Sequence, residues 1–169
     1  MTQPTGRIET RDGVLHLVIE RTFRAPIDDV WAAVTEPERM ARWIGTWTGD
    51  SATRRVHFRM LFEGGDPDDA GEEVDIRECD PPRRLAVTTH AGGQSWQLEL
   101  DLSEADGVTT LVFTQPAVDG AEAENVGPGW EYYLDRLVRA ESGGDPAEVD
   151  FERDYYPAMQ EHYRAQVTG

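Results

Sequence analysis

The sequence predicts an α+β fold, in which a curved antiparallel sheet of about six or seven strands surrounds a long C-terminal helix. Two patterns predict it. Apolar and polar residues alternate with a period of two through most of residues 47–115, and residues 129–140 carry one apolar helical stripe. A sheet that bends around this helix would bury the apolar side of every element at once.

The first strand is expected at residues 14–24, where Leu15, Leu17, Ile19 and Phe23 share one face. The residues between them are mostly polar, as expected of a half-buried strand. This strand therefore contributes one side to the core.

Two short helices are expected next. Pro26 presets the backbone for the first, whose opening turn carries two aspartates at the positive end of the helix dipole. The spacing of Thr35 and Glu38 is that of a capping box, with Thr35 as the N-cap of the second helix. The second helix places Trp43 on one side and ends near Gly45.

The remaining strands repeat the alternation, with turns at Asp80-Pro81-Pro82, at Gly92-Gly93 and at Asp106-Gly107. Their apolar positions are Val56, Phe58, Met60 and Phe62, then Val74 and Ile76, then Leu85 and Val87, then Trp96, Leu98, Leu100 and Leu102, then Leu111 and Phe113. Thr89, Thr109 and Gln115 are polar residues on the same side.

Residues 116–127 lack periodicity and are expected to form a loop. The long helix then follows Pro128, with Trp130, Tyr133, Leu134, Leu137 and Val138 on its apolar face and Glu131, Asp135, Arg136 and Arg139 opposite. A weaker helical pattern at 147–166 is interrupted by Pro157. We expect a single domain over residues 1–169, with a core at 14–142 and an additional helical tail at 143–169.

The composition of the chain limits the classes of partner that the protein is expected to bind. The formal charge of −17 repels nucleic-acid phosphates and anionic lipid surfaces, so we expect no nucleic-acid partner. No apolar run is long enough for membrane insertion, and the lone cysteine, Cys79, cannot close an internal disulfide. These features predict a cytoplasmic protein.

The stretch "RTFRAPIDDVWAAVTEPERMARWIG" resembles the N-terminal signature of the activator of heat-shock protein 90 ATPase homologue-like family, in the START-like (SRPBCC, helix-grip) superfamily. The matching pieces are Ala25-Pro26, Val30-Trp31, Thr35-Glu36-Pro37 and Trp43, and "GWEYYLDRL" at 129–137 is similar to the closing helix of that family. The resemblance implies that the two short helices plug the open end of the sheet. It also implies a cavity between the sheet and the long helix that takes apolar small molecules such as lipids or polyketides.

We therefore expect a ligand-binding protein, without catalytic residues, that holds a small hydrophobic or amphipathic molecule in this cavity. The expected lining is Trp43, Trp47, Phe58, Met60, Val74, Ile76, Val87, Thr89, Trp96, Leu98, Leu111, Phe113, Gln115, Trp130, Tyr133 and Leu134. The alternative for each residue is that it fills a close-packed core. Thr89 and Gln115 would orient a ligand or hydrogen-bond each other.

An enzyme is the first alternative, because the superfamily includes polyketide cyclases and aromatases. A cyclase or hydrolase-like activity needs an inward acid or base, for which Tyr133, Glu63 and Arg59 are the candidates. No metal or cofactor is expected. None of His16, His57, His90 and His162 has metal-ligand spacing, and the acidic stretch 64–73 fails the calcium-loop pattern at two required positions.

A protein-interaction module, such as a stress-related co-chaperone, is the second alternative, with Tyr155, Tyr156 and Tyr163 as exposed aromatic residues of the tail. They could equally pack back onto the sheet, and the same tail could form a homodimer. The co-chaperone of the family's name uses a separate N-terminal domain to engage the chaperone, whereas about a dozen residues precede the first expected strand here. We therefore do not expect a chaperone partner.

Overall fold

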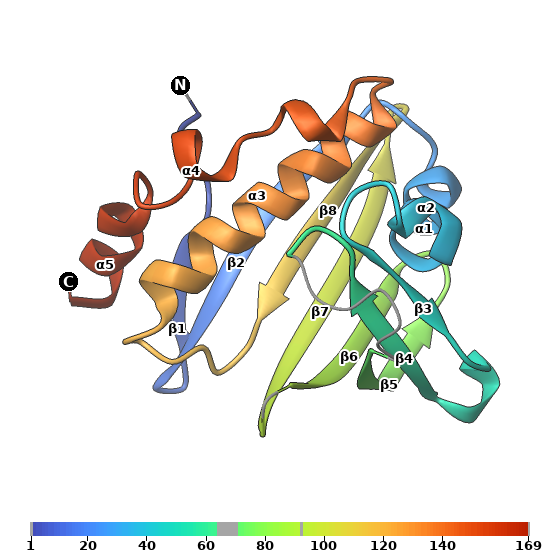
Figure 1. Ribbon diagram of the computed structural model, residues 1–169, viewed down its shortest axis with the longest axis horizontal. Coiled ribbons are helices and arrows are strands. Elements are labelled where there is room, and N and C mark those ends of the chain that lie inside the picture. The colour runs from blue at the N-terminus through green and yellow to red at the C-terminus, as the bar shows by residue number, and fades with distance from the viewer. Residues whose placement is uncertain (1, 64–70, 92, 169) are drawn as a thin grey trace.

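The computed structural model describes residues 2–63, 71–91 and 93–168. The strands form one eight-stranded antiparallel sheet in the order β1-β2-β8-β7-β6-β5-β4-β3. They are β1 (Arg7–Arg11), β2 (Val14–Phe23), β3 (Gly45–Thr48), β4 (Arg55–Met60), β5 (Glu72–Asp80), β6 (Arg84–Ala91), β7 (Gln94–Ala105) and β8 (Val108–Gln115). Figure 1 shows this sheet curving beneath the long helix α3 (Ala123–Glu141), which confirms the predicted fold class.

Two strands of the sheet, β1 and β3, were not predicted from the sequence. The sequence of β1 is RIETR, with one apolar residue, and β3 has four residues. Neither is long enough or apolar enough to be identified by alternation. Both are edge strands of the sheet, where short and polar strands are common.

The core lies between α3 and the part of the sheet formed by β2 and β8. Leu17 and Ile19 of β2, Phe113 of β8 and Leu134 and Leu137 of α3 are each at most 3% exposed. Burying each such side chain contributes about 1.5–3 kcal/mol relative to leaving it in water. The backbone of α3 lies close to β2 and to the tail, and within the described residues it makes no comparably close approach to β4–β7.

The long helix begins earlier than predicted, at Ala123, so the expected loop at 116–127 is wrong for its last five residues. Pro128 lies inside the helix, and glycines flank it on both sides, which is a poor intrinsic helix sequence. Tertiary packing overrides that preference. A Cβ atom at Gly127 would lie 2.6 Å from the Tyr163 ring, so the glycine allows the tail to pack directly against the start of α3.

The two short helices are α1 (Ile27–Thr35) and α2 (Pro37–Met40), and Figure 1 places them beside one end of the sheet. The predicted capping box is wrong. The N-cap of α2 is Glu36, and the Thr35 hydroxyl instead donates to the Trp31 carbonyl at 2.7 Å, within α1. Pro37 at the first helical position explains the shift, since a proline there needs no capped N–H.

The tail forms a short 3-10 turn, η2 (Pro146–Glu148), followed by α4 (Phe151–Asp154) and α5 (Gln160–Thr168). The helical pattern predicted at 147–166 is therefore split around Pro157. Because α5 and η2 cover one side of α3, two residues of its predicted polar face, Glu131 and Arg136, are buried.

Candidate functional site

The pairing of strands places the predicted lining residues on one face of the sheet. Across neighbouring strands, Leu98 of β7 pairs with Val87 of β6, and Val87 pairs with Ile76 of β5. Directly paired residues of antiparallel strands point to the same side. The same face carries the core residues beneath α3, such as Phe113, which pairs with Leu100.

Part of the predicted lining is core rather than accessible surface. Trp43, Leu111, Phe113, Tyr133 and Leu134 belong to the main hydrophobic cluster, and Val74 and Gln115 are also buried. The Trp43 indole donates to the Ala33 carbonyl at 2.9 Å, which joins α1 to the turn between α2 and β3. These residues therefore fit the alternative interpretation, in which they fill a close-packed core.

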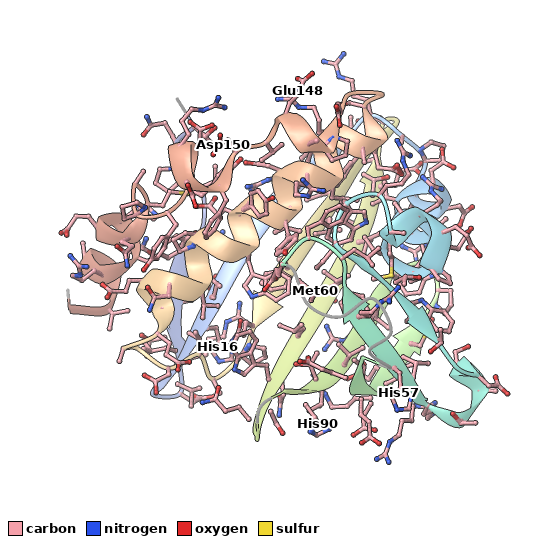
Figure 2. All side chains as sticks on the ribbon, viewed as in Figure 1. His16, His57, Met60, His90, Glu148 and Asp150 are labelled. Carbon is pink, nitrogen blue, oxygen red and sulfur yellow. The ribbon has the colours of Figure 1, made fainter. Side chains whose placement is uncertain are left out.

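The other predicted residues remain part-exposed, and we call them the open face. They are Trp47, Phe58, Met60, Ile76, Val87, Thr89, Trp96, Leu98 and Trp130. All but Thr89 are apolar. Figure 2 labels one of them, Met60, near the middle of the molecule, below α3 in this view. Contiguous apolar surface that stays in contact with water is a common mark of a binding site.

Two side-chain contacts join the segment that follows β4 to α3, at the border of the open face. The Tyr133 hydroxyl donates to Glu63 at 2.7 Å, and the Arg136 guanidinium lies 4.0 Å from the centre of the Phe62 ring. Burial, and secondly the Glu63 carboxylate, raise the pKa of Tyr133. Tyr133 therefore stays protonated at neutral pH and acts as a hydrogen-bond donor.

The predicted polar groups of the inward side have separate roles. Gln115 accepts a hydrogen bond from the Trp130 indole at 3.0 Å, so it orients that ring rather than pairing with Thr89. Arg59 pairs with Thr46, on the side of β4 opposite Phe58 and Met60. It does not belong to the open face.

Three of the four histidines lie in or beside polar surroundings away from the open face. His90 lies 2.9 Å from both Asp75 and Ser95, and His162 Nε2 lies 2.7 Å from the Gly6 carbonyl. His57 projects from the lower rim of the sheet in Figure 2. His16 has a buried Nδ1 without a hydrogen-bond partner among the described residues. The acidic stretch weighed as a calcium loop falls largely on 64–70, outside the described residues.

Sequence reasoning missed a buried polar network beneath the tail. The Glu131 carboxylate is fully buried and accepts hydrogen bonds from the Thr5 amide and hydroxyl at 2.7 and 2.5 Å, and from the Tyr163 hydroxyl at 2.8 Å. Arg21 lies 3.4 Å from Glu131 and 2.9 Å from Asp135. The carboxylate is saturated with donors, which makes it a structural anchor.

This network corrects the idea that the tail tyrosines form an interaction surface. Tyr163 and Tyr155 are 0% and 2% exposed, and Tyr155 donates to Asp135 at 2.5 Å. Both tyrosines pack back onto the rest of the protein, as the alternative interpretation predicted, but they pack onto α3 rather than onto the sheet. Only Tyr156 of the three is exposed, at 37%, where it stacks on Phe151.

Two pockets lie mostly outside the open face, and the sequence pattern predicted neither. One, of about 430 Å³, lies between α3 and the tail and includes Asp135, Arg139 and Tyr155. The other, of about 700 Å³, lies beside the β3–β4 turn. Of the predicted lining residues, only Ile76 borders either pocket.

A curved antiparallel sheet, two short helices after its second strand and a long C-terminal helix define the START-like, helix-grip class. The family model described as "Activator of Hsp90 ATPase homolog 1-like protein" matches residues 24–140, and the chain belongs to this family. No protein of curated function matches the chain significantly.

Solved structures share the fold. CalU16 from Micromonospora echinospora matches with a TM-score of 0.72 and 26% sequence identity, over 99% of this chain and 98% of that chain. Protein EF2215 from Enterococcus faecalis, of unknown function, matches with a TM-score of 0.69 and 21% identity, over 98% and 91%. DynU16, from the dynemicin biosynthetic locus, matches with a TM-score of 0.60 and 22% identity, over 78% of this chain and 49% of that chain.

Among the helices in the described part of the chain, none is both long and apolar enough to cross a bilayer.

Proposed function

We propose that this protein binds a small apolar or amphipathic molecule on the open face, between the curved sheet and α3, without catalysing a reaction on it. The observation that carries the proposal is the exposure of this face. Its apolar side chains project toward the same side as the core, yet they remain partly accessible to water. Covering them with a ligand would contribute about 25 cal/mol per Å² of apolar area removed from water.

Aromatic residues at two sides of the open face support the proposal. Trp96 projects from β7, and Trp130 projects from α3, where it lies 4.6 Å from Phe113, ring centre to ring centre. Rigid aromatic side chains offer a large contact area at a small cost in conformational entropy. The hydrogen bond from Trp130 to Gln115 holds this ring in place before a ligand arrives.

The three groups named for an enzyme alternative give it little support. Tyr133 is held protonated by burial and by Glu63, Glu63 accepts that hydrogen bond, and Arg59 lies on the other side of β4. A general base needs an accessible acceptor directed at the substrate. The geometry therefore favours binding over acid–base catalysis by these groups.

The proposal is tested with the neutral apolar dye N-phenyl-1-naphthylamine, followed by competition with a panel of lipids and polyketides. We expect saturable dye binding, accompanied by quenching of tryptophan fluorescence from Trp96 and Trp130. Val87→Arg places a charge on the open face and should weaken dye binding about tenfold or more, since a charge opposes apolar burial. Native mass spectrometry of the protein from its own host would identify a retained ligand.

Gln97→Arg is the matched control. Gln97 is an exposed neighbour of Leu98 in β7 and points to the opposite side of the sheet. This variant adds the same charge and should leave dye binding unchanged. Equal loss in both variants, or no saturable binding by the unmodified protein, would contradict the proposal.

A further inference from the structure

We propose a second binding site, for a small molecule with a carboxylate or phosphate group, in the hollow beside the β3–β4 turn. The hollow has a volume of about 700 Å³. It is lined by Gly49, Thr53, Arg54, Arg55, His57, Asp75 and Ile76. The hollow shares Ile76 with the open face, and its other six lining residues lie outside that face.

The charge of the hollow differs from that of the chain as a whole. The sequence contains 33 acidic residues against 16 Lys and Arg. Among the residues that line the hollow, Arg54 and Arg55 stand against one acid, Asp75, and Glu73 lies at its edge, 3.9 Å from Arg55. The pocket under the tail has the opposite balance, with Arg139 and Arg153 against three acids. The hollow therefore lacks the acidic excess of the chain as a whole, and an anion is repelled less there than elsewhere on the protein.

Arg54 supplies donors that the protein does not use. It follows the turn η1 (Ser51–Thr53) and has a left-handed backbone, with φ of 62°. Its Nη1 donates to the Arg77 carbonyl at 3.3 Å, which is its one side-chain hydrogen bond within the described residues. A guanidinium has five N–H donors in a planar fork that matches carboxylates and phosphates. Most of this fork is therefore available to a ligand.

His57 is the second available group. Its imidazole has no hydrogen bond or ion pair among the described residues. Glu73, its partner across β4 and β5, lies within 3.9 Å of Arg55 instead. In Figure 2, His57 and His90 project from the same rim of the sheet, away from α3.

The acid of the hollow is already neutralised. Asp75 accepts a hydrogen bond from Arg55 at 2.8 Å and lies 2.9 Å from His90. The hydrogen bond from Arg55, and then that from His90, lower the pKa of Asp75. Since Asp75 is engaged by these two groups, an incoming oxyanion can reach Arg54 and His57 without displacing a carboxylate from them.

The test uses inorganic phosphate and succinate, titrated separately into the isotopically labelled full chain at constant ionic strength and followed by amide NMR. We expect saturable shifts confined to residues around Thr53–His57 and Asp75. The tighter of the two probes distinguishes a phosphate ligand from a carboxylate ligand. Arg54→Gln and His57→Gln should each weaken binding about tenfold, the effect of losing one charge-assisted hydrogen bond.

Arg24→Gln is the control, because Arg24 is exposed and has no ion pair among the described residues. It removes the same charge outside the hollow and should leave the dissociation constant unchanged. The proposal is overturned if neither probe gives saturable shifts, if the shifts lie elsewhere, or if Arg24→Gln weakens binding as much as Arg54→Gln. Dye binding on the open face should be the same in all these variants, which separates this test from that of the proposed function.

Discussion

The two halves of the concave face follow the same sequence pattern and reach different states of burial. On β2 and β8, Ile19 and Leu111 are completely buried beneath α3. On β6 and β7, Val87 and Leu98 point to the same side but remain part-exposed. Alternation therefore predicts the direction of a side chain, whereas its burial depends on what lies above it.

Charged side chains help to decide which half α3 covers. Arg21 extends from β2 to Asp135 and Glu131 of α3, and Tyr163 of α5 reaches the same Glu131. These contacts tie the helix to β2 and to the tail. Because buried charges are costly unless paired, this network strongly favours one position of the helix over others.

The largest expected effect is a difference in stability between the two halves. Leu134→Ala, in the covered half, should lower the free energy of unfolding by about 2–5 kcal/mol because it leaves a cavity in a packed core. Val87→Ala, in the open half, should cost less than about 1 kcal/mol, since that side chain is already partly in water. Urea unfolding measures the loss of stability in both variants. Equal losses would contradict the division of the concave face into a covered and an open half.

The second prediction concerns the network that holds the covered half together. Glu131→Gln should destabilise the protein by about 2–4 kcal/mol, because it leaves the donors around Glu131 without a charged acceptor. Tyr163→Phe removes one donor and should cost about 1 kcal/mol. Thermal or urea unfolding compares the two variants, and a smaller loss in Glu131→Gln than in Tyr163→Phe would show that the carboxylate is not the anchor.

The third prediction concerns how the stability of the covered half depends on pH. Burial is the main cause that raises the pKa of Tyr155 and Tyr163, with their carboxylate partners Asp135 and Glu131 contributing in the same direction. The unfolded value is about 10. A raised folded pKa gives stability that is complete below about pH 10 and is lost as the pH rises above it.

Alkaline titration should therefore show phenolate absorbance from these two tyrosines appearing together with loss of the far-ultraviolet circular dichroism signal. Tyr156, which is exposed, serves as the internal comparison. Ionisation of every tyrosine near pH 10 in a chain that keeps its native circular dichroism would show that the tail is not packed as described.

The sequence predicted the fold class, the long helix and the direction of most inward residues, because these follow from the period of apolar residues. It did not reveal β1, whose RIETR sequence has one apolar side chain, or the start of α3, where packing of Tyr163 on Gly127 overrides a poor helix sequence. That the whole chain forms a single domain stays a prediction.

The sequence predicted on which side of the sheet the residues of the candidate site lie, but not which of them remain exposed. Trp96 and Leu111 have the same pattern, and only the position of α3 makes one part-exposed and the other buried. The hollow beside the β3–β4 turn was not predictable, because Arg54 and His57 come together with Asp75 through the pairing of β4 with β5. Pairing between strands is a long-range property that a local pattern does not contain.

The smallest expected effect lies at the border between the two halves, where Tyr133 of α3 donates to Glu63 beyond β4. Tyr133→Phe removes this bond and should lower the free energy of unfolding by about 1 kcal/mol. Glu63→Gln keeps a carbonyl acceptor and should cost less, so the pair separates loss of the bond from loss of the charge. Neither variant changes an apolar side chain of the open face, and binding of N-phenyl-1-naphthylamine should change less than about twofold. A tenfold change in either variant would place this bond inside the ligand site and remove the boundary between the covered and open halves.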